Sequence, residues 1–222
     1  MVVSCTRPGV EAVVFDIGGV LLDWNPRYLY RKLFSDEAEM ERFLADVCTL
    51  AWHDAHDRGT PLYEGCAALS RAHPQHEAEI MAWALRSEEM IAGPIDGSVA
   101  LLAELRARGV RCYALTNMEV ETYPLRRERF DFLGWFDGTV VSSQEQVAKP
   151  DPEIFTRLLK RFELSPETTV MIDDAPRNLQ AARALGMQTV RFQSPAQLRA
   201  WLAGAGLVDA EDPEHGPRYP RT

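Results

Sequence analysis

The chain has 222 residues, of which 46% are hydrophobic and 26% are charged, and its formal net charge is −9. This composition is typical of a soluble globular protein, and the acidic balance argues against a nucleic-acid partner, which requires a clustered basic face. No apolar run approaches the roughly 20 residues of a membrane span, and the first residues lack the pattern of a secretory signal. The four cysteines are scattered without paired spacing, so we expect reduced thiols in a cytoplasmic protein with no membrane partner.

The segment Glu11–Trp24, EAVVFDIGGVLLDW, contains a short apolar strand that ends in a single carboxylate, Asp16. Gly18 and Gly19 follow, and glycine lets the backbone turn tightly enough for a main-chain carbonyl to approach a bound group. The segment therefore predicts a strand whose end presents one acid and one accessible carbonyl.

The next part of the chain has a helical pattern. In Asp36–Val47 the apolar residues recur at positions i, i+3, i+4 and i+7, which is typical of an amphipathic helix. Similar patterns continue through 64–72 and 77–91. We therefore expect an all-helical block over residues 25–92.

Beyond residue 93 short apolar strands alternate with amphipathic helices. The expected strands are 110–116, 138–142, 168–174 and 188–192, and the expected helices include 98–109, 151–162, 178–186 and one that begins at 194. Asp151 and Ser194 are suitable N-cap residues, each followed by a proline at the first helical position. Alternation of this kind predicts a doubly wound α/β fold, with a parallel sheet covered by helices on both faces.

The expected organisation is thus a core made of residues 10–24 and 93–208, interrupted after its first strand by the helical block 25–92. The polar, proline-rich tail 209–222 is expected to be flexible. The arginine-rich run 125–130 is interpreted as a solvated helix face.

The chemistry-bearing residues follow the predicted strands. They are Asp16, Thr116, Asn117, Lys149, Asp173 and Asp174. The carboxyl ends of parallel strands lie at one edge of a sheet, where ligands bind. Several carboxylates at one place need a cation, and Mg²⁺ with oxygen ligands and a phosphate is the natural choice. The set therefore predicts transfer of a phosphoryl group to an aspartate, which water then hydrolyses.

Four motifs, VVFDIGGVL, ALTN, KPDPEIF and MIDDAPRNLQAARALGM, resemble in order and spacing those of the haloacid dehalogenase-like (HAD) hydrolases. This resemblance implies a Rossmann-like core, with the helical block as the family's cap. It also implies a role for each motif residue. Asp16 would be the nucleophile, paired with Lys149. Thr116 and Asn117 would bind the phosphate. Asp16, the Gly18 carbonyl and Asp174 would ligate Mg²⁺, and Asp173 would be a further ligand or would position the others.

One position departs from the family pattern. Related phosphatases usually have a second acid two residues after the nucleophile, which protonates the leaving oxygen and later activates water; here that residue is Gly18. The leaving group could need little help, as in an anomeric or acyl phosphate. A cap residue could replace the acid, with His53, His56, Asp57 and Asp23 as candidates. Alternatively, phosphatase activity could be weak or absent.

The cap sequence WHDAHDRGT, residues 52–60, suggests contacts with the substrate more than a metal site. Arg58 is the residue that we expect to bind an anionic or polyol substrate. Trp24, Asn25 and Arg27, where the chain leaves the core, are further candidates.

The favoured function is a Mg²⁺-dependent phosphatase of a small phosphorylated metabolite, and sugar 1-phosphates are the favoured substrates. The alternatives are a 2-haloacid dehalogenase, which needs neither metal nor second acid, and a phosphate-binding module without turnover. We expect a monomer or a homodimer.

Overall fold

The computed structural model of the chain describes residues 9–210. Cys5 and residues 211–222 of the expected tail lie outside this range. Within it, Asp209 is attached to the core, because its backbone N–H donates to Glu104 Oε1 at 3.1 Å.

A five-stranded parallel sheet forms the centre of the core, as the sequence predicts. Its strand order is β5-β4-β1-β6-β7. The strands are β1 Ala12–Phe15, β4 Arg111–Thr116, β5 Gly138–Val141, β6 Thr169–Asp173 and β7 Gln188–Arg191. Val14 of the central strand pairs with Tyr113 of β4 and with Met171 of β6. The first strand is thereby enclosed on both sides, and its carboxyl end lies in the middle of the sheet edge.

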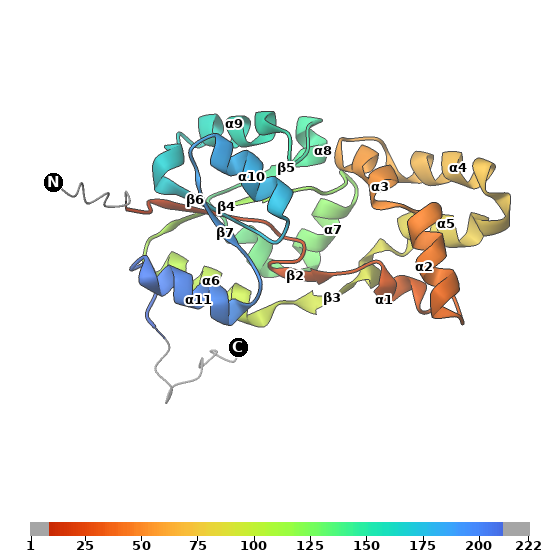
Figure 1. The fold of residues 1–222 in the computed structure, drawn as a ribbon, viewed down its shortest axis with the longest axis horizontal. Helices are drawn as coiled ribbons and strands as arrows, with labels where there is room; N and C mark the ends of the chain where they lie inside the picture. The colour runs from red at the N-terminus through yellow and green to blue at the C-terminus, as the bar shows by residue number, and fades with distance from the viewer. Residues whose placement is uncertain (1–8, 211–222) are drawn as a thin grey trace.

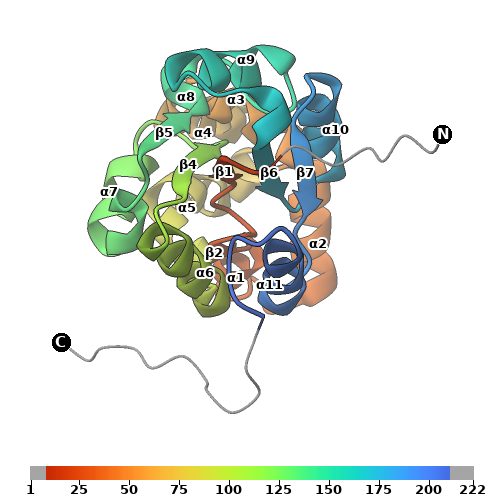
Figure 2. The same ribbon diagram turned by 90° about the vertical axis from the view of Figure 1, so that its left-hand side faces the viewer.

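Helices cover both faces of the sheet, because alternate strand residues are apolar on both sides. Val13 and Phe15 pack with α6 (Asp96–Ala107) and α11 (Pro195–Gly204). Val14, which lies between them in the strand, points to the opposite face of the sheet and packs with α9 (Pro152–Arg161) and α10 (Pro176–Ala184). The end-on view in Figure 2 shows these two helical layers on opposite sides of the strands.

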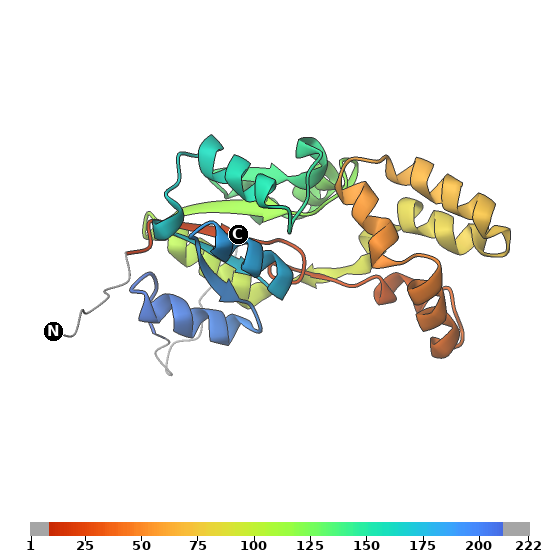
Figure 3. The same ribbon diagram turned by 45° about the horizontal axis from the view of Figure 1, so that its top comes forward.

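A two-stranded antiparallel ribbon, β2 (Leu22–Trp24) with β3 (Ile91–Pro94), joins the core to the helices inserted after β1. Figures 1 and 3 show the ribbon between the sheet at one end of the molecule and the inserted helices at the other. We call residues 25–90 the cap. The ribbon was not predicted: Ile91 and Ala92, expected at the end of the helical block, lie in β3.

The cap contains helices with an apolar centre of their own. They are α1 Arg27–Tyr30, α2 Glu37–Asp46, α3 Leu50–Asp57, α4 Leu62–Ala72 and α5 Glu77–Leu85, with 3₁₀ turns η1 Pro74–His76 and η2 Ser87–Met90. Tyr30, Phe43 and Trp83 are buried at this centre. The cap therefore has a hydrophobic cluster separate from the two beside the sheet.

The remaining core elements are α7 Thr122–Arg129, η3 Asp131–Gly134, α8 Ser142–Glu145 and η4 Pro166–Thr168. The two predicted N-caps are confirmed: the side chains of Asp151 and Ser194 accept from the backbone N–H groups of Glu153 and Gln197. Within residues 9–210, every helix is too short or too polar to cross a lipid bilayer.

Candidate active site

Asp16 lies directly beyond the central strand β1. Its backbone N–H donates to the Ile172 carbonyl at 2.9 Å, which extends the pairing of β1 with β6 by one residue. The N–H of Ile17 donates to Asp16 Oδ1 at 2.7 Å. Asp16 is only 8% exposed. The fold thus fixes this carboxylate at the carboxyl edge of the sheet, where the sequence predicts it.

Lys149 holds two buried carboxylates together. Its Nζ lies 2.9 Å from Asp16 Oδ1 and 2.8 Å from Asp173 Oδ2. Burial lowers the pKa of Lys149, but the two carboxylates outweigh it and the net shift is upward. Burial also raises the pKa of Asp16 to about 8, with Lys149 opposing this shift and Asp173 adding to it.

Asp173 and Asp174 stand at the end of β6 but have different surroundings. Asp173 is fully buried, and its oxygens accept from Asn178 Nδ2 at 3.0 Å, from the Ala175 N–H at 2.9 Å and from Lys149. Asp174 is exposed and lines the cavity described below. Asp173 is therefore held as a positioning group, whereas Asp174 has a carboxylate open to a ligand.

The residues present suit a hard divalent cation. One oxygen from each of Asp16, Asp173 and Asp174 lies within 4.8 Å of the others. With Lys149 beside them, the fully ionised set keeps two formal negative charges, which a divalent cation balances. Gly19 has a φ of +73°, and a Cβ there would lie 2.6 Å from Asp174 Oδ2, so only glycine lets this carboxylate approach the turn.

The Gly18 carbonyl is available at the same place. The backbone hydrogen bonds described for this turn end on the carbonyls of Ile17 and Leu22 and leave the Gly18 oxygen unused. Gly18 also lines the cavity. The carbonyl is thus free to add a neutral oxygen ligand to those of the carboxylates.

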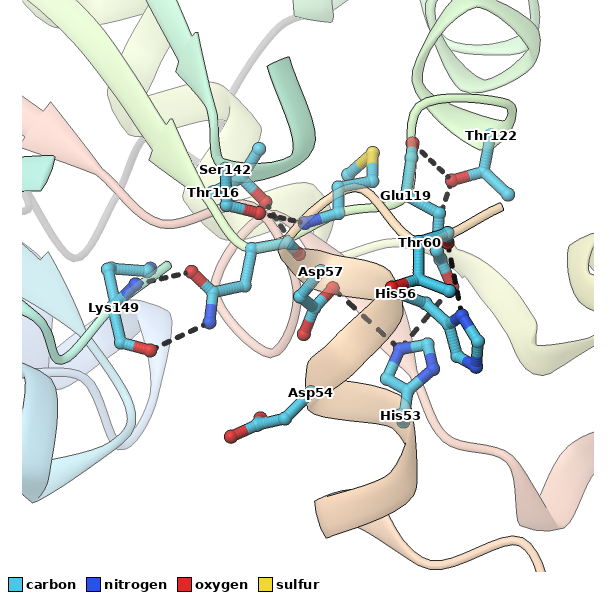
Figure 4. A network of polar contacts seen from close by, with 12 residues as sticks. His53, Asp54, His56, Asp57, Thr60, Thr116, Glu119, Thr122, Ser142 and Lys149 are labelled. Atoms are coloured by element: carbon cyan, nitrogen blue, oxygen red, sulfur yellow. Dashed lines mark hydrogen bonds and ion pairs between the residues drawn. The ribbon is translucent and has the colours of Figure 1, made fainter. Parts of the chain in front are cut away.

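Thr116 and Asn117, predicted to bind phosphate, lie at the end of β4. The Asn117 side chain is fully engaged elsewhere: Nδ2 donates to the Lys149 carbonyl at 2.9 Å, and Oδ1 accepts from the Lys149 N–H at 2.8 Å. This pair of bonds fixes the Lys149 segment beside the sheet, as Figure 4 shows. Thr116 is buried, its hydroxyl has a 3.4 Å contact with the Asn117 carbonyl, and it is not among the residues that line the cavity described below. A phosphate contact from Asn117 would therefore come from its backbone.

A cavity of about 520 Å³ lies between the core and the cap. The core contributes Asp16, Gly18, Lys149, Asp174 and Arg177, and the cap and its connections contribute Trp24, Asn25, Arg27, Glu41, His53, Asp54, Asp57 and Trp83. This volume fits a small molecule. Arg27, at its edge, forms a two-pronged ion pair with Glu41 at 2.5 and 2.6 Å.

Arg58, which we expected to bind substrate, does not face this cavity. It is exposed and terminates α3. His53 and Asp57 are one helical turn apart and line the cavity, whereas the next residue is rotated by about 100° from Asp57 and points elsewhere. Arg58 is thus one helical position away from the residues of α3 that line the cavity.

Of the four candidates for the missing acid, two reach the cavity. His53 and Asp57 line it, but His56 and Asp23 do not. His56 is buried within the cap, with Nδ1 3.1 Å from the Thr60 carbonyl. Asp23 accepts from the Tyr28 hydroxyl at 2.9 and 3.0 Å.

A polar network connects the cap wall of the cavity to the core. His53 Nε2 lies 3.3 Å from Glu119 Oε1, and Glu119 Oε2 accepts from the Thr122 hydroxyl at 2.7 Å (Figure 4). Arg126 lies 3.9 Å from Glu119 and 3.2 Å from Glu88. Burial opposes ionisation of Glu119, but His53, Arg126 and Thr122 outweigh it, so its pKa is lowered. Burial lowers the pKa of His53, which favours the neutral imidazole.

Arg126 and Glu119 were missed by the sequence analysis. Arg126 belongs to the run 125–130, interpreted as a solvated face, but it is 5% exposed and lines the cavity. The interpretation holds for Arg127 and Arg129, which are exposed. The available signal was the spacing of Arg126 four residues from Thr122 and from Phe130, which marks the buried face of α7.

This arrangement at the carboxyl edge of the sheet has a counterpart in known proteins. The family model of haloacid dehalogenase-like hydrolases matches residues 10–186. The chain belongs to this family. The match spans β1, the cap and β6, so the HAD-type assignment covers every element that contributes to the site.

Individual HAD proteins agree with this assignment. The sesquiterpene phosphatase astK of Aspergillus oryzae is 28% identical over 177 residues, which cover 80% of this chain and 87% of that protein. A phosphorylated carbohydrates phosphatase of Thermotoga maritima is 24% identical over 183 residues, covering 82% and 84%. A HAD-family enzyme of Bacteroides thetaiotaomicron, solved with magnesium and inorganic phosphate, superimposes with a TM-score of 0.64 at 20% identity, covering 84% of this chain and 96% of that one. The two sequence relatives are phosphatases, and the structure supports the same fold.

Proposed function

We propose that this protein is a Mg²⁺-dependent phosphatase of a small phosphorylated metabolite. The observation that carries the proposal is the position of Asp16, held by Lys149 beside two further carboxylates on the floor of a capped cavity. Such a group can attack phosphorus, provided that the negative charges of carboxylate and phosphate are neutralised. The phosphatase relatives support this reaction over others that the fold hosts.

Asp16, Asp174 and the Gly18 carbonyl would hold the cation, with Asp173 anchored behind them. The cation supplies charge neutralisation at the phosphoryl group. Lys149 keeps Asp16 oriented and adds a positive charge next to the attacking oxygen. Thr116 and the backbone after β4 would bind the phosphoryl oxygens. The attack leaves the phosphoryl group on Asp16, and water then releases it as inorganic phosphate.

Sugar 1-phosphates are the first substrates to test. The cavity combines aromatic side chains, Trp24 and Trp83, with charged ones such as Arg27 and Asp54, a mixture suited to a polyol. The relatives act on phosphorylated carbohydrates in one case and on a sesquiterpene in the other, so the panel must include an apolar phosphate.

The test is phosphate release from sugar, acyl, nucleotide and sesquiterpenyl phosphates with Mg²⁺. Asp16→Asn and excess EDTA should each abolish release, and acid quenching should trap a phosphorylated wild-type chain but not the variant. Activity toward 2-haloacids that survives EDTA would instead identify a dehalogenase. Tight phosphate binding without turnover of any substrate would identify a binding module.

A further inference from the structure

The leaving-group proton has no carboxylic-acid donor in the turn after Asp16, and the Lys149 ammonium beside Asp16 is paired with two carboxylates that raise its pKa. Family phosphatases place an acid two residues after the nucleophile, and here that residue is Gly18. A Cβ built on Gly18 would meet nothing within 4 Å, so the place of the usual acid is open space in the cavity. A poor leaving group must therefore be protonated from another wall.

We propose that Asp57, from the cap, donates this proton and later accepts one from the attacking water. This inference rests on the proposed phosphatase function and identifies the acid–base group of that same site.

Asp57 lies on the cap side of the cavity, across from the sheet edge that carries Asp16. It projects from α3 into the cavity that contains Asp16 and Lys149, and Figure 4 shows it on the side of α3 that faces the end of β4 at Thr116 and the loop carrying Lys149. The segment after it is pressed against the core: Gly59 has a φ of +101°, and a Cβ there would lie 3.0 Å from the Ser143 carbonyl of α8. This close approach fixes the end of α3 over the sheet edge.

Within residues 9–210, the Asp57 carboxyl group makes no described hydrogen bond and has a long ion-pair contact with His53. It is 6% exposed, and its Oδ1 is buried without a hydrogen-bond partner. The nearest base, His53 Nε2, is 3.9 Å from Oδ1, which is too long for a hydrogen bond. His53 Nε2 lies closer to Glu119, at 3.3 Å. A buried polar group that the fold leaves unpaired is costly, which is expected where the partner is a ligand.

The surroundings favour the protonated form that an acid needs. Burial raises the pKa of Asp57 to about 8, and Glu119 in the loop after β4 adds to the shift, followed by Asp54 on its own helix. From the core, Lys149 opposes the shift and Asp16 adds to it. His53 does not counteract Glu119 fully, because burial lowers its pKa. Asp57 can therefore hold a proton near neutral pH and still release it.

The steps balance with Asp57 as the only acid–base group. In the first, an Asp16 oxygen bonds to phosphorus, the bond from phosphorus to the ester oxygen breaks, and the Asp57 proton moves to that oxygen to release the alcohol. In the second, a water oxygen bonds to phosphorus, one of its protons moves to the Asp57 carboxylate, and the bond to Asp16 breaks. Both side chains return to their starting states, with alcohol and inorganic phosphate as products.

The other cavity acids of α3 and its neighbours suit this role less. Asp54 is on the same face but is half-exposed and lies 3.9 Å from the Arg177 guanidinium. Glu119 already accepts from Thr122 and lies beside Arg126, and its pKa is lowered, so it holds no proton at neutral pH.

The test compares Asp57→Asn with the wild-type protein on two esters in Mg²⁺. One is p-nitrophenyl phosphate, whose leaving group needs no proton; the other is the sugar phosphate that the wild type hydrolyses fastest. We expect the first-turnover rate of alcohol release from the sugar phosphate to fall about 100-fold or more, and the first-turnover rate of nitrophenol release from the aryl ester to stay within about threefold. Steady-state turnover of both esters should fall, because hydrolysis of phosphorylated Asp16 needs Asp57 as the base. Asp46→Asn, an exposed acid on α2, is the matched control and should change none of these rates.

A second variant excludes a folding defect. Gly18→Asp in the Asp57→Asn background restores an acid at the open position and should recover the first-turnover rate of alcohol release from the sugar phosphate at least tenfold, without gain in the first-turnover rate of nitrophenol release. Equal losses in the two first-turnover rates, or a rise in KM with unchanged kcat, would overturn the role of Asp57 while leaving the phosphatase intact. A wild type that is inactive on every ester would overturn both proposals.

Discussion

The Nζ of Lys149 lies 2.9 Å from Asp16 Oδ1, so the proposed nucleophile is paired with the ammonium group of a buried lysine that is 1% exposed. The same Nζ is 2.8 Å from Asp173. One buried cation therefore compensates two buried anions at the ends of the neighbouring strands β1 and β6.

Lys149→Met should therefore lower both activity and stability. Loss of the ammonium leaves Asp16 and Asp173 unpaired, and breaking a buried pair in this way costs about 3–5 kcal/mol. Protonation of the carboxylates relieves the repulsion, so the loss in free energy of unfolding should be smaller at pH 5 than at pH 8. Urea unfolding at both pH values in EDTA measures this. Lys160→Met on α9, outside the site, is the control. A loss that does not depend on pH would contradict the account.

Gly19→Ala should weaken cation binding, whereas Gly18→Ala should not. The Cβ at residue 19 would lie 2.6 Å from Asp174 Oδ2, and a φ of +73° disfavours alanine; at residue 18 the Cβ has open space. We expect the Mg²⁺ concentration for half-maximal activity to rise at least tenfold in Gly19→Ala, together with a stability loss of about 1 kcal/mol. Calorimetric titration of both variants with Mg²⁺ measures the two affinities directly. Equal affinities would show that Asp174 does not bind the cation.

Asp57→Asn should stabilise the protein at alkaline pH. The folded pKa of Asp57 is about 8, against about 3.9 in an unfolded chain. The folded state holds the extra proton between these values, so this group's contribution to stability is full below about pH 4 and is lost as the pH rises through 8. Asparagine does not titrate. We expect the variant to gain more than about 1 kcal/mol over the wild type between pH 5 and pH 9, measured by urea unfolding. Parallel pH profiles would mean that Asp57 is ionised.

Glu119→Gln should move the alkaline limb of the activity profile. The negative charge of Glu119 raises the pKa of Asp57, so its removal should let Asp57 lose its proton at lower pH. We expect the decline in kcat/KM for an alkyl phosphate to shift downward by about half a pH unit or more. Glu128→Gln on the exposed face of α7 is the control. An unchanged pH for this decline would show that the charge of Glu119 does not affect the pKa of Asp57.

Much of the core could be predicted from the sequence because strand ends follow a local rule. Asp16, Lys149 and Asp174 each come directly after an apolar run or an obvious motif, and a parallel sheet brings such positions to one edge. The cap contribution was harder to predict. Arg58 and Asp57 are adjacent in the chain, and the direction in which α3 faces the core decides which of them reaches the cavity.

Other features had a weak local signal or none. The strands Leu22–Trp24 and Ile91–Pro94 are three and four residues long and pair across the whole cap, so neither has a recognisable pattern alone. The spacing of Arg126 from Thr122 and Phe130 is compatible with a buried face, but the charges that pair with it, Glu119 and Glu88, come from outside α7. Such positions depend on tertiary contacts that a window of sequence does not contain.

The β2–β3 ribbon has a consequence for how this protein could change. Trp24 pairs with Ile91, so the chain leaves the core and re-enters it at neighbouring points, and the ends of the inserted segment meet without strain on the sheet. An insertion closed in this way can vary in length and side chains at little cost to the rest, because loop-closure entropy grows only slowly with length. The three carboxylates at the sheet edge and the cap side chains that line the cavity are thus encoded in separate stretches of one chain, and one set can change while the other stays fixed.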